Sequence, residues 1–211
     1  MAPLNLKKAI SAAARVAQDA VDDMISQYSE GLTTDEDDLT GILVGALRVR
    51  LNGQIEGLSW QASILRHRAG IAAEEKRVGA DMILHISLDT EEKKFSKGVL
   101  IQAKRTDPHK RLTPKEQQDL KDQCRKMRRY SNASFVFNYS KNLMRCGSAL
   151  GVESSTDIKL SQDLPVSSLD FFKKFFECTI GDPSLTSAHV SDLPVPYAVF
   201  LKARSLTSFV D

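Results

Sequence analysis

The sequence GVLIQAKR at residues 98–105 decides the fold, because it has the pattern of a buried strand that ends in polar residues. Val99, Leu100 and Ile101 form a continuous apolar run, which is typical of a strand covered on both faces. Gln102 and Lys104 follow at its end. Lysine is almost never fully buried without a partner. Either the strand reaches the surface here, or these two polar side chains have a function at its tip.

The residues before this strand predict two more strands and place a carboxylate near the tip. Residues 59–67 (SWQASILRH) and 80–88 (ADMILHISL) are short and rich in strand-forming residues. The polar segment 89–94 predicts a hairpin between 80–88 and 97–104. Side chains alternate along a strand, so Gln102 and Lys104 share one face. Asp81 begins its strand, so a hairpin would bring it beside them.

Helices are predicted on either side of these strands. Apolar residues recur at helical spacing over 6–29, and a second helix is expected from Thr33 or Thr34 to about Arg50. Pro114 begins a helix to about residue 129, and SFVFNY at 134–139 predicts a further strand. The strand–helix–strand order implies a parallel pairing through a right-handed crossover. The fold class is therefore α/β, with a mixed central sheet flanked by helices.

The remaining sequence gives weaker patterns. We expect a helix around 141–150, a helix over 168–178 with a cluster of phenylalanines, and a strand over 197–201. The chain is interpreted as one domain in three parts: an N-terminal helix at 1–31, an α/β core at 32–140, and a C-terminal, mainly helical elaboration at 141–211.

Composition limits the classes of protein to consider. The 211 residues include 42% hydrophobic and 27% charged residues, as in an ordinary globular protein. A net charge of +2 is too small to indicate nucleic-acid binding by itself. The three cysteines form no CxxC pair, so a reducing, cytoplasmic location is expected. No apolar run approaches the roughly 20 residues of a membrane span, and no secretory signal is recognisable.

The three residues at the predicted strand tip suggest a type of chemistry. Carboxylate and amide oxygens are hard ligands that suit Mg²⁺ or Mn²⁺. Such a metal lowers the pKa of a bound water and neutralises charge on a phosphate. A neighbouring lysine can orient that water or stabilise developing charge. Asp81, Gln102 and Lys104 together outline a site for phosphodiester hydrolysis.

GAD at 79–81 followed by QAK at 102–104 resembles the PD-(D/E)XK, or restriction endonuclease-like, nuclease superfamily. The Q-x-K ending is similar to that of Mrr-like nucleases. The resemblance implies an α-β-β-β-α-β core, which the predicted elements over 34–140 match. It also implies that Asp81 binds the metal, that Gln102 occupies the position of the usual glutamate, and that Lys104 is catalytic. An amide binds Mg²⁺ more weakly than a carboxylate, so the glutamine leaves room for an inactive member.

Glu36 is a candidate for a further acid that the resemblance implies on the helix before the sheet. It lies one helical turn before Leu39, so it can point toward the sheet. Asp37 and Asp38 are the second choices. Glu36 also completes a possible capping box with Thr33, in which it would only stabilise the helix start. Both roles remain open at this stage.

Basic residues follow the predicted catalytic strand. They are either a solvated face or a track for a phosphate backbone. Gln123, on the same helix, could face the site. The candidate nucleic-acid-binding residues are Arg105, Lys110, Arg111, Lys121, Arg125 and Arg128.

The sequence therefore predicts a metal-dependent nuclease that acts on DNA and uses Mg²⁺ or Mn²⁺. The resemblance suggests an effector subunit of an anti-phage defence or mobile-element system, targeted by a partner protein or by formation of a homodimer. One alternative is a protein that keeps the fold with a weakened metal site and binds nucleic acid or assembles with partners. Another is a protein-interaction domain whose basic helix binds an acidic partner.

Overall fold

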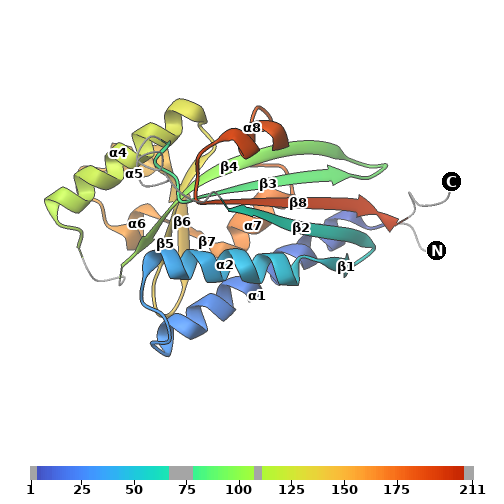
Figure 1. Ribbon diagram of the computed structural model, residues 1–211, viewed down its shortest axis with the longest axis horizontal. Helices are drawn as coiled ribbons and strands as arrows, with labels where there is room; N and C mark the ends of the chain where they lie inside the picture. Colours follow the sequence, from blue (N-terminus) through green and yellow to red (C-terminus); the bar gives the residue numbers. More distant parts are fainter. Residues whose placement is uncertain (1–3, 67–77, 107–110, 207–211) are drawn as a thin grey trace.

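An eight-stranded mixed sheet forms the centre of the computed structural model, which describes residues 4–66, 78–106 and 111–206 (Figure 1). The strands lie in the order β1-β2-β8-β3-β4-β5-β6-β7. Their bounds are β1 Gly53–Ile55, β2 Leu58–Arg66, β3 Met82–Asp89, β4 Lys94–Arg105, β5 Ser134–Tyr139, β6 Met144–Ser148, β7 Val166–Ser167 and β8 Tyr197–Ser205. The helices are α1 Leu6–Ser29, α2 Glu36–Arg50, α4 Pro114–Tyr130, α5 Ala149–Ser154, α6 Leu160–Asp163, α7 Ser168–Phe176 and α8 Ser187–Asp192.

The predicted hairpin and the predicted parallel pairing of the fourth strand are confirmed. Strands β3 and β4 pair antiparallel, with Met82 opposite Ile101 and Asp89 opposite Lys94. After α4 the chain returns as β5, which pairs parallel to β4. Thr113 caps α4 in a capping box with Glu116, and Pro114 occupies its first turn. The local sequence patterns were sufficient here because each element carries its own start and stop residues.

Strand β8 has a position that the sequence did not reveal. It lies between β2 and β3, antiparallel to β2 and parallel to β3. The predicted strand at 197–201 is therefore longer than expected, and it is part of the middle of the sheet. Ala198, Val199 and Leu201 are fully buried, because helices cover both faces at this point. The C-terminal region thus completes the sheet.

The helix expected around 141–150 is wrong. Residues 144–148 form β6, which pairs antiparallel with β5, and α5 begins only at Ala149. Met144 and Cys146 are buried at alternate positions, as strand geometry requires. A side chain at Gly147 would have its Cβ only 2.5 Å from Leu164, so glycine lets the next segment pack closely. Ser148 then caps α5 by accepting a hydrogen bond from the Gly151 N–H.

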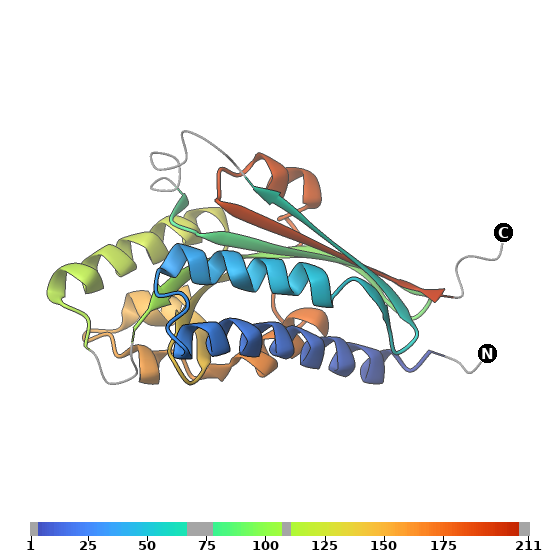
Figure 2. The same ribbon diagram turned by 60° about the horizontal axis from the view of Figure 1, so that its bottom comes forward.

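The two faces of the sheet carry separate cores. Helices α1, α2 and α7 cover the first face, and α4, α5 and α8 cover the second (Figure 2). Phe171 of α7 meets the rings of Phe135 and Phe137 on β5 edge to face, with centroids 5.2 and 4.8 Å apart. No helix within the described ranges is both long and apolar enough to cross a membrane.

We expect Phe171→Ala to lower the free energy of unfolding by about 3–5 kcal/mol, because it leaves a cavity in the core of the first face. Leu169→Ala, on the same helix but 38% exposed, serves as the control and should cost less than about 1 kcal/mol. Urea unfolding followed by circular dichroism measures both. Equal losses would show that α7 does not anchor this core.

Candidate active site

Asp81 and Gln102 meet as the hairpin predicted. The Gln102 Nε2 donates to Asp81 Oδ2 at 2.5 Å, and the backbone N–H of Ala103 donates to the same oxygen at 2.7 Å. The Gln102 amide also donates to the Ala103 carbonyl at 3.0 Å. Both donors to Asp81 come from the end of β4. The start of one strand is thus fixed to the end of the next by a single carboxylate oxygen.

Glu36 and Lys104 form the second half of the site. The Lys104 Nζ lies 3.1 Å from Glu36 Oε1, and the backbone N–H of Arg105 donates to Glu36 Oε2 at 2.7 Å. Each oxygen of Glu36 therefore has a partner on β4. Asp37 and Asp38, the second choices for this acid, are exposed. The structure brings together Asp81, Gln102, Lys104 and Glu36, which come from three separate segments of the chain.

The capping box expected at Thr33 does not form. Helix α2 begins at Glu36, and Asp35 is the cap, with its side chain accepting from the Asp37 N–H at 2.9 Å. Thr33 Oγ1 is buried without a hydrogen-bond partner. Aspartate is itself a strong helix cap and stands closer to the first turn. The Glu36 carboxylate is consequently available to the sheet.

The backbone at Asp81 is held on both sides. Its N–H donates to the Ile101 carbonyl at 2.9 Å, and its own carbonyl accepts from the Tyr197 N–H at 3.3 Å. Gly79 has a positive φ of 78°. A Cβ at Gly79 would lie 2.6 Å from the Gln123 carbonyl oxygen, so only glycine lets α4 pack here. Gln123 Oε1 is buried without a partner, and no contact places it in the site.

The pKa of Asp81 is raised to about 7. Burial is the largest cause, because it disfavours the charged carboxylate, and the negative charges of Glu36 and Asp37 add to it. The Lys104 charge and the Ala103 N–H act in the opposite direction. At neutral pH the carboxyl is therefore poised between its two states. Strongly shifted groups of this kind are typical of functional sites.

We expect Asp81→Asn to stabilise the metal-free protein at about pH 8. The folded-state pKa of about 7 lies above the ordinary 3.8, so the folded state holds this proton more tightly. The carboxyl therefore contributes stability that is lost as pH rises from 3.8 through 7. Asparagine keeps an oxygen acceptor and has no such loss, so the gain should be on the order of 1–3 kcal/mol at pH 8 and shrink toward pH 5. Urea unfolding in EDTA at both pH values measures it.

Asp119→Asn, at an exposed position of α4, is the matched control and should show no such pH-dependent difference from the wild type. A pH-independent effect of Asp81→Asn would contradict the raised pKa.

The predicted nucleic-acid-binding residues divide into two groups. Arg105 and Arg111 are exposed, and Lys121 is half-buried. Arg128 Nη1 donates to Glu153 Oε2 at 2.5 Å, and Arg125 Nε lies 3.5 Å from Glu153 Oε1. These two arginines are therefore partly neutralised by α5, which leaves the first group better suited to bind phosphate. Lys110 lies outside the described residues.

The oxygen atoms around Asp81 are of the kind that bind hard cations such as Mg²⁺, but of the four site residues only two, Asp81 and Glu36, have carboxylate side chains. Asp81 and Glu36 offer carboxylate oxygens, and Gln102 offers an amide oxygen. Within residues 4–66, 78–106 and 111–206, no three His, Cys, Asp or Glu side chains gather closely enough to hold a metal ion by themselves. Gln102 would have to supply the third ligand. The Gln102 Nε2 now faces Asp81. Rotation of the Gln102 amide by 180° about its last side-chain bond would present Oε1 there instead.

Comparisons with protein-family models, with curated proteins and with solved structures found no match. The chemistry of the site must therefore be inferred from the contacts of its own side chains.

A second polar cluster lies outside the residues that the sequence singled out. His85 Nε2 lies 2.9 Å from Ser96 Oγ, and the histidine borders a pocket with Lys202 and Arg204. The alternation His85, Ser87, Asp89 on β3 indicated a polar strand face. However, the partners on β8 could not be identified without the strand order.

Proposed function

We propose that this protein is a metal-dependent nuclease that hydrolyses phosphodiester bonds, with DNA as its substrate and Mg²⁺ or Mn²⁺ as its cofactor. The convergence of Asp81, Lys104 and Glu36 at one end of the sheet carries the proposal. Asp81 lies just before β3, Lys104 is in β4 and Glu36 is in α2. Their types are those that phosphodiester hydrolysis requires. A structural ion pair alone would not explain the adjacent buried carboxyl with a pKa near 7.

Asp81, Glu36 and the amide oxygen of Gln102 would hold the metal ion. When bound, the ion lowers the pKa of a water molecule and neutralises charge on the phosphate. Asp81 would be ionised in that state, because a bound cation favours the carboxylate. Glu36 already lies against β4 through the Arg105 N–H, so its second oxygen can exchange Lys104 for another cation without moving the helix.

Lys104 would then act on the substrate. Its ammonium is half-buried and lies 3.1 Å from Glu36, so it is held at the site. Released from Glu36, it can orient the attacking water or stabilise the negative charge that develops on the phosphate. Because Lys104 is already held at the end of β4, less side-chain freedom has to be lost when it meets the substrate.

The order of elements supports a restriction endonuclease-like core. Helix α2, strands β2, β3 and β4, helix α4 and strand β5 occur in this order along the chain, which matches α-β-β-β-α-β once the short strand β1 between α2 and β2 is set aside. In space, β8 separates β2 from β3, so it is an addition to that simple order. Arg105, Arg111 and Lys121 would contact the DNA backbone beside the site. By analogy, we extend the proposal to an effector subunit that a partner or a second copy targets.

A catalytically weakened protein that binds nucleic acid or assembles with partners is the second candidate, and one contact favours it. Gln102 turns its NH₂ group toward Asp81, so the carboxylate is satisfied by two protein donors without a metal. The amide also carries no charge to offset that of a divalent cation.

Cleavage of supercoiled and linear DNA tests the proposal. We expect cutting with Mg²⁺ or Mn²⁺, none with EDTA, and losses of about 10²-fold or more in Asp81→Ala and Lys104→Ala, since each removes a group that acts on the reacting atoms. Lys173→Ala, an exposed cation on α7, should cut as the wild type does. DNA binding without cleavage, unchanged in Lys104→Ala, would instead support the second candidate.

Gln102→Glu separates the two candidates further. A carboxylate beside Asp81 should lower the melting temperature in EDTA, because two negative charges then share a buried site. It should also increase the rise in melting temperature that Mg²⁺ produces, because an added charge strengthens binding of the ion. Thermal unfolding with and without Mg²⁺ measures both effects. Gln54→Glu, at an exposed position of β1, is the control. An Mg²⁺ response no larger than that of the wild type would argue against a metal at Gln102.

A further inference from the structure

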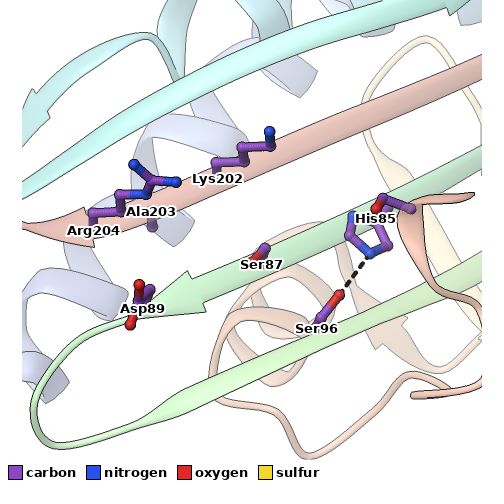
Figure 3. Close-up of a pocket in the computed structure, with 8 residues that line it drawn as sticks. His85, Ser87, Asp89, Ser96, Lys202, Ala203 and Arg204 are labelled. Carbon is purple, nitrogen blue, oxygen red and sulfur yellow. Dashed lines mark hydrogen bonds between the residues drawn. The ribbon is translucent and has the colours of Figure 1, made fainter.

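A polar pocket of about 260 Å³ lies on the second face of the sheet, away from the candidate active site (Figure 3). It is lined by residues of β3, β4 and β8 and by Ser187 of α8. Helix α8 borders the pocket through Ser187, and no residue of α4 or α5 is among its lining residues. The lining residues are His85, Ser87, Asp89, Ser96, Ser187, Lys202, Ala203 and Arg204.

Strand register places three donors in one row across the pocket. Ser87 lies directly opposite Lys202 on β8 and directly opposite Ser96 on β4. Neighbouring strands are about 4.8 Å apart, and residues opposite one another point to the same side of a sheet. One ammonium and two hydroxyl groups therefore face the same space. Figure 3 shows these side chains, with Arg204 two residues after Lys202 on β8.

The charge of the pocket is positive. Lys202 and Arg204 are both exposed, and neither forms an ion pair with a residue in the described part of the chain. Asp89 is the carboxylate among the lining residues, and its Oδ1 lies 2.9 Å from Lys94 Nζ. Its charge is thus already balanced by a lysine. Two cations remain to interact with a ligand.

His85 organises the centre of the pocket as a neutral group. The residue is only 2% exposed, and its Nε2 lies 2.9 Å from Ser96 Oγ. Its pKa is lowered to about 4, first by burial and then by the charge of Lys202. The imidazole is therefore uncharged at neutral pH and fixes the orientation of the Ser96 hydroxyl.

We propose that this pocket binds a phosphate group, held by Lys202 and Arg204 with the Ser87 and Ser96 hydroxyls as further donors. Two cations and two hydroxyls in a hollow are the groups that phosphate oxygens accept from. The phosphate could belong to the backbone of a nucleic acid or to a free nucleotide.

The pocket is separate from the candidate active site but lies on the same face of the sheet. Ser96 and Gln102 are six residues apart on β4 and point to the same side, which corresponds to about 20 Å. One phosphate cannot reach both. Gly98 and Leu100, which lie between them on the same side of β4, are covered by other parts of the chain, so the two sites are not joined by an open surface along this strand. The inference itself does not require cleavage at Asp81.

Calorimetric titration in EDTA, where no metal-dependent cleavage occurs, tests the site. The probes are pyrophosphate and a short DNA duplex, each at low ionic strength. The variant Lys202→Gln/Arg204→Gln removes both cations and should weaken binding about tenfold or more. Arg15→Gln/Arg48→Gln removes the same charge from exposed positions of α1 and α2, and it should bind as the wild type does. Ser87→Ala should weaken binding by a smaller factor, and thermal unfolding confirms that each variant is folded.

The two probes identify the source of the phosphate. Weaker binding of the duplex by the Lys202→Gln/Arg204→Gln variant supports a nucleic-acid backbone, whereas weaker binding of pyrophosphate alone supports a free nucleotide. The proposal is overturned if the wild-type protein binds neither probe. It is also overturned if this variant binds both probes as tightly as the wild type, or if the Arg15→Gln/Arg48→Gln control loses as much affinity.

Discussion

The site depends on one carboxylate oxygen, Asp81 Oδ2, which accepts hydrogen bonds from the Gln102 amide and the Ala103 N–H. These bonds fix the start of β3 to the end of β4, and the next two residues of β4 then bind Glu36. Helix α2 is thereby held at the same end of the sheet. A change at Asp81 would consequently affect Gln102, Lys104 and the position of α2 together.

The same arrangement has an electrostatic cost. Asp81 is desolvated, the nearby Lys104 is shared with Glu36, and the pKa of Asp81 rises to about 7. Proteins tolerate such a buried acid when it has a purpose, since a neutral residue of similar shape would be more stable there. A divalent cation between Asp81 and Glu36 would remove this cost. In the proposed nuclease, this buried acid is the point at which an added positive charge would be most favourable.

Much of the site could be predicted from the sequence because its information is local. The loop after Asp89 predicted the β3–β4 hairpin, and the hairpin placed Asp81 beside Gln102. The sequence did not single out Asp35 as the cap of α2, because Thr33 and Thr34 just before it are also residue types that cap helices. The position of β8 could not be predicted, because no local pattern encodes which strand lies beside a C-terminal segment. Lys202 and Arg204 of the polar pocket could not be predicted for the same reason.

The uncovered part of the second face is encoded in the strands themselves. On β3 and β8, polar residues at 87, 89, 202 and 204 alternate with Leu88, Leu201 and Ala203, which are at most 2% exposed. The first face of these strands is thus fully packed at the very positions where the second face is open. A strand end that merely frayed into solvent would expose both sides. The alternation instead produces a polar surface with a packed core behind it, which suits the proposed phosphate site.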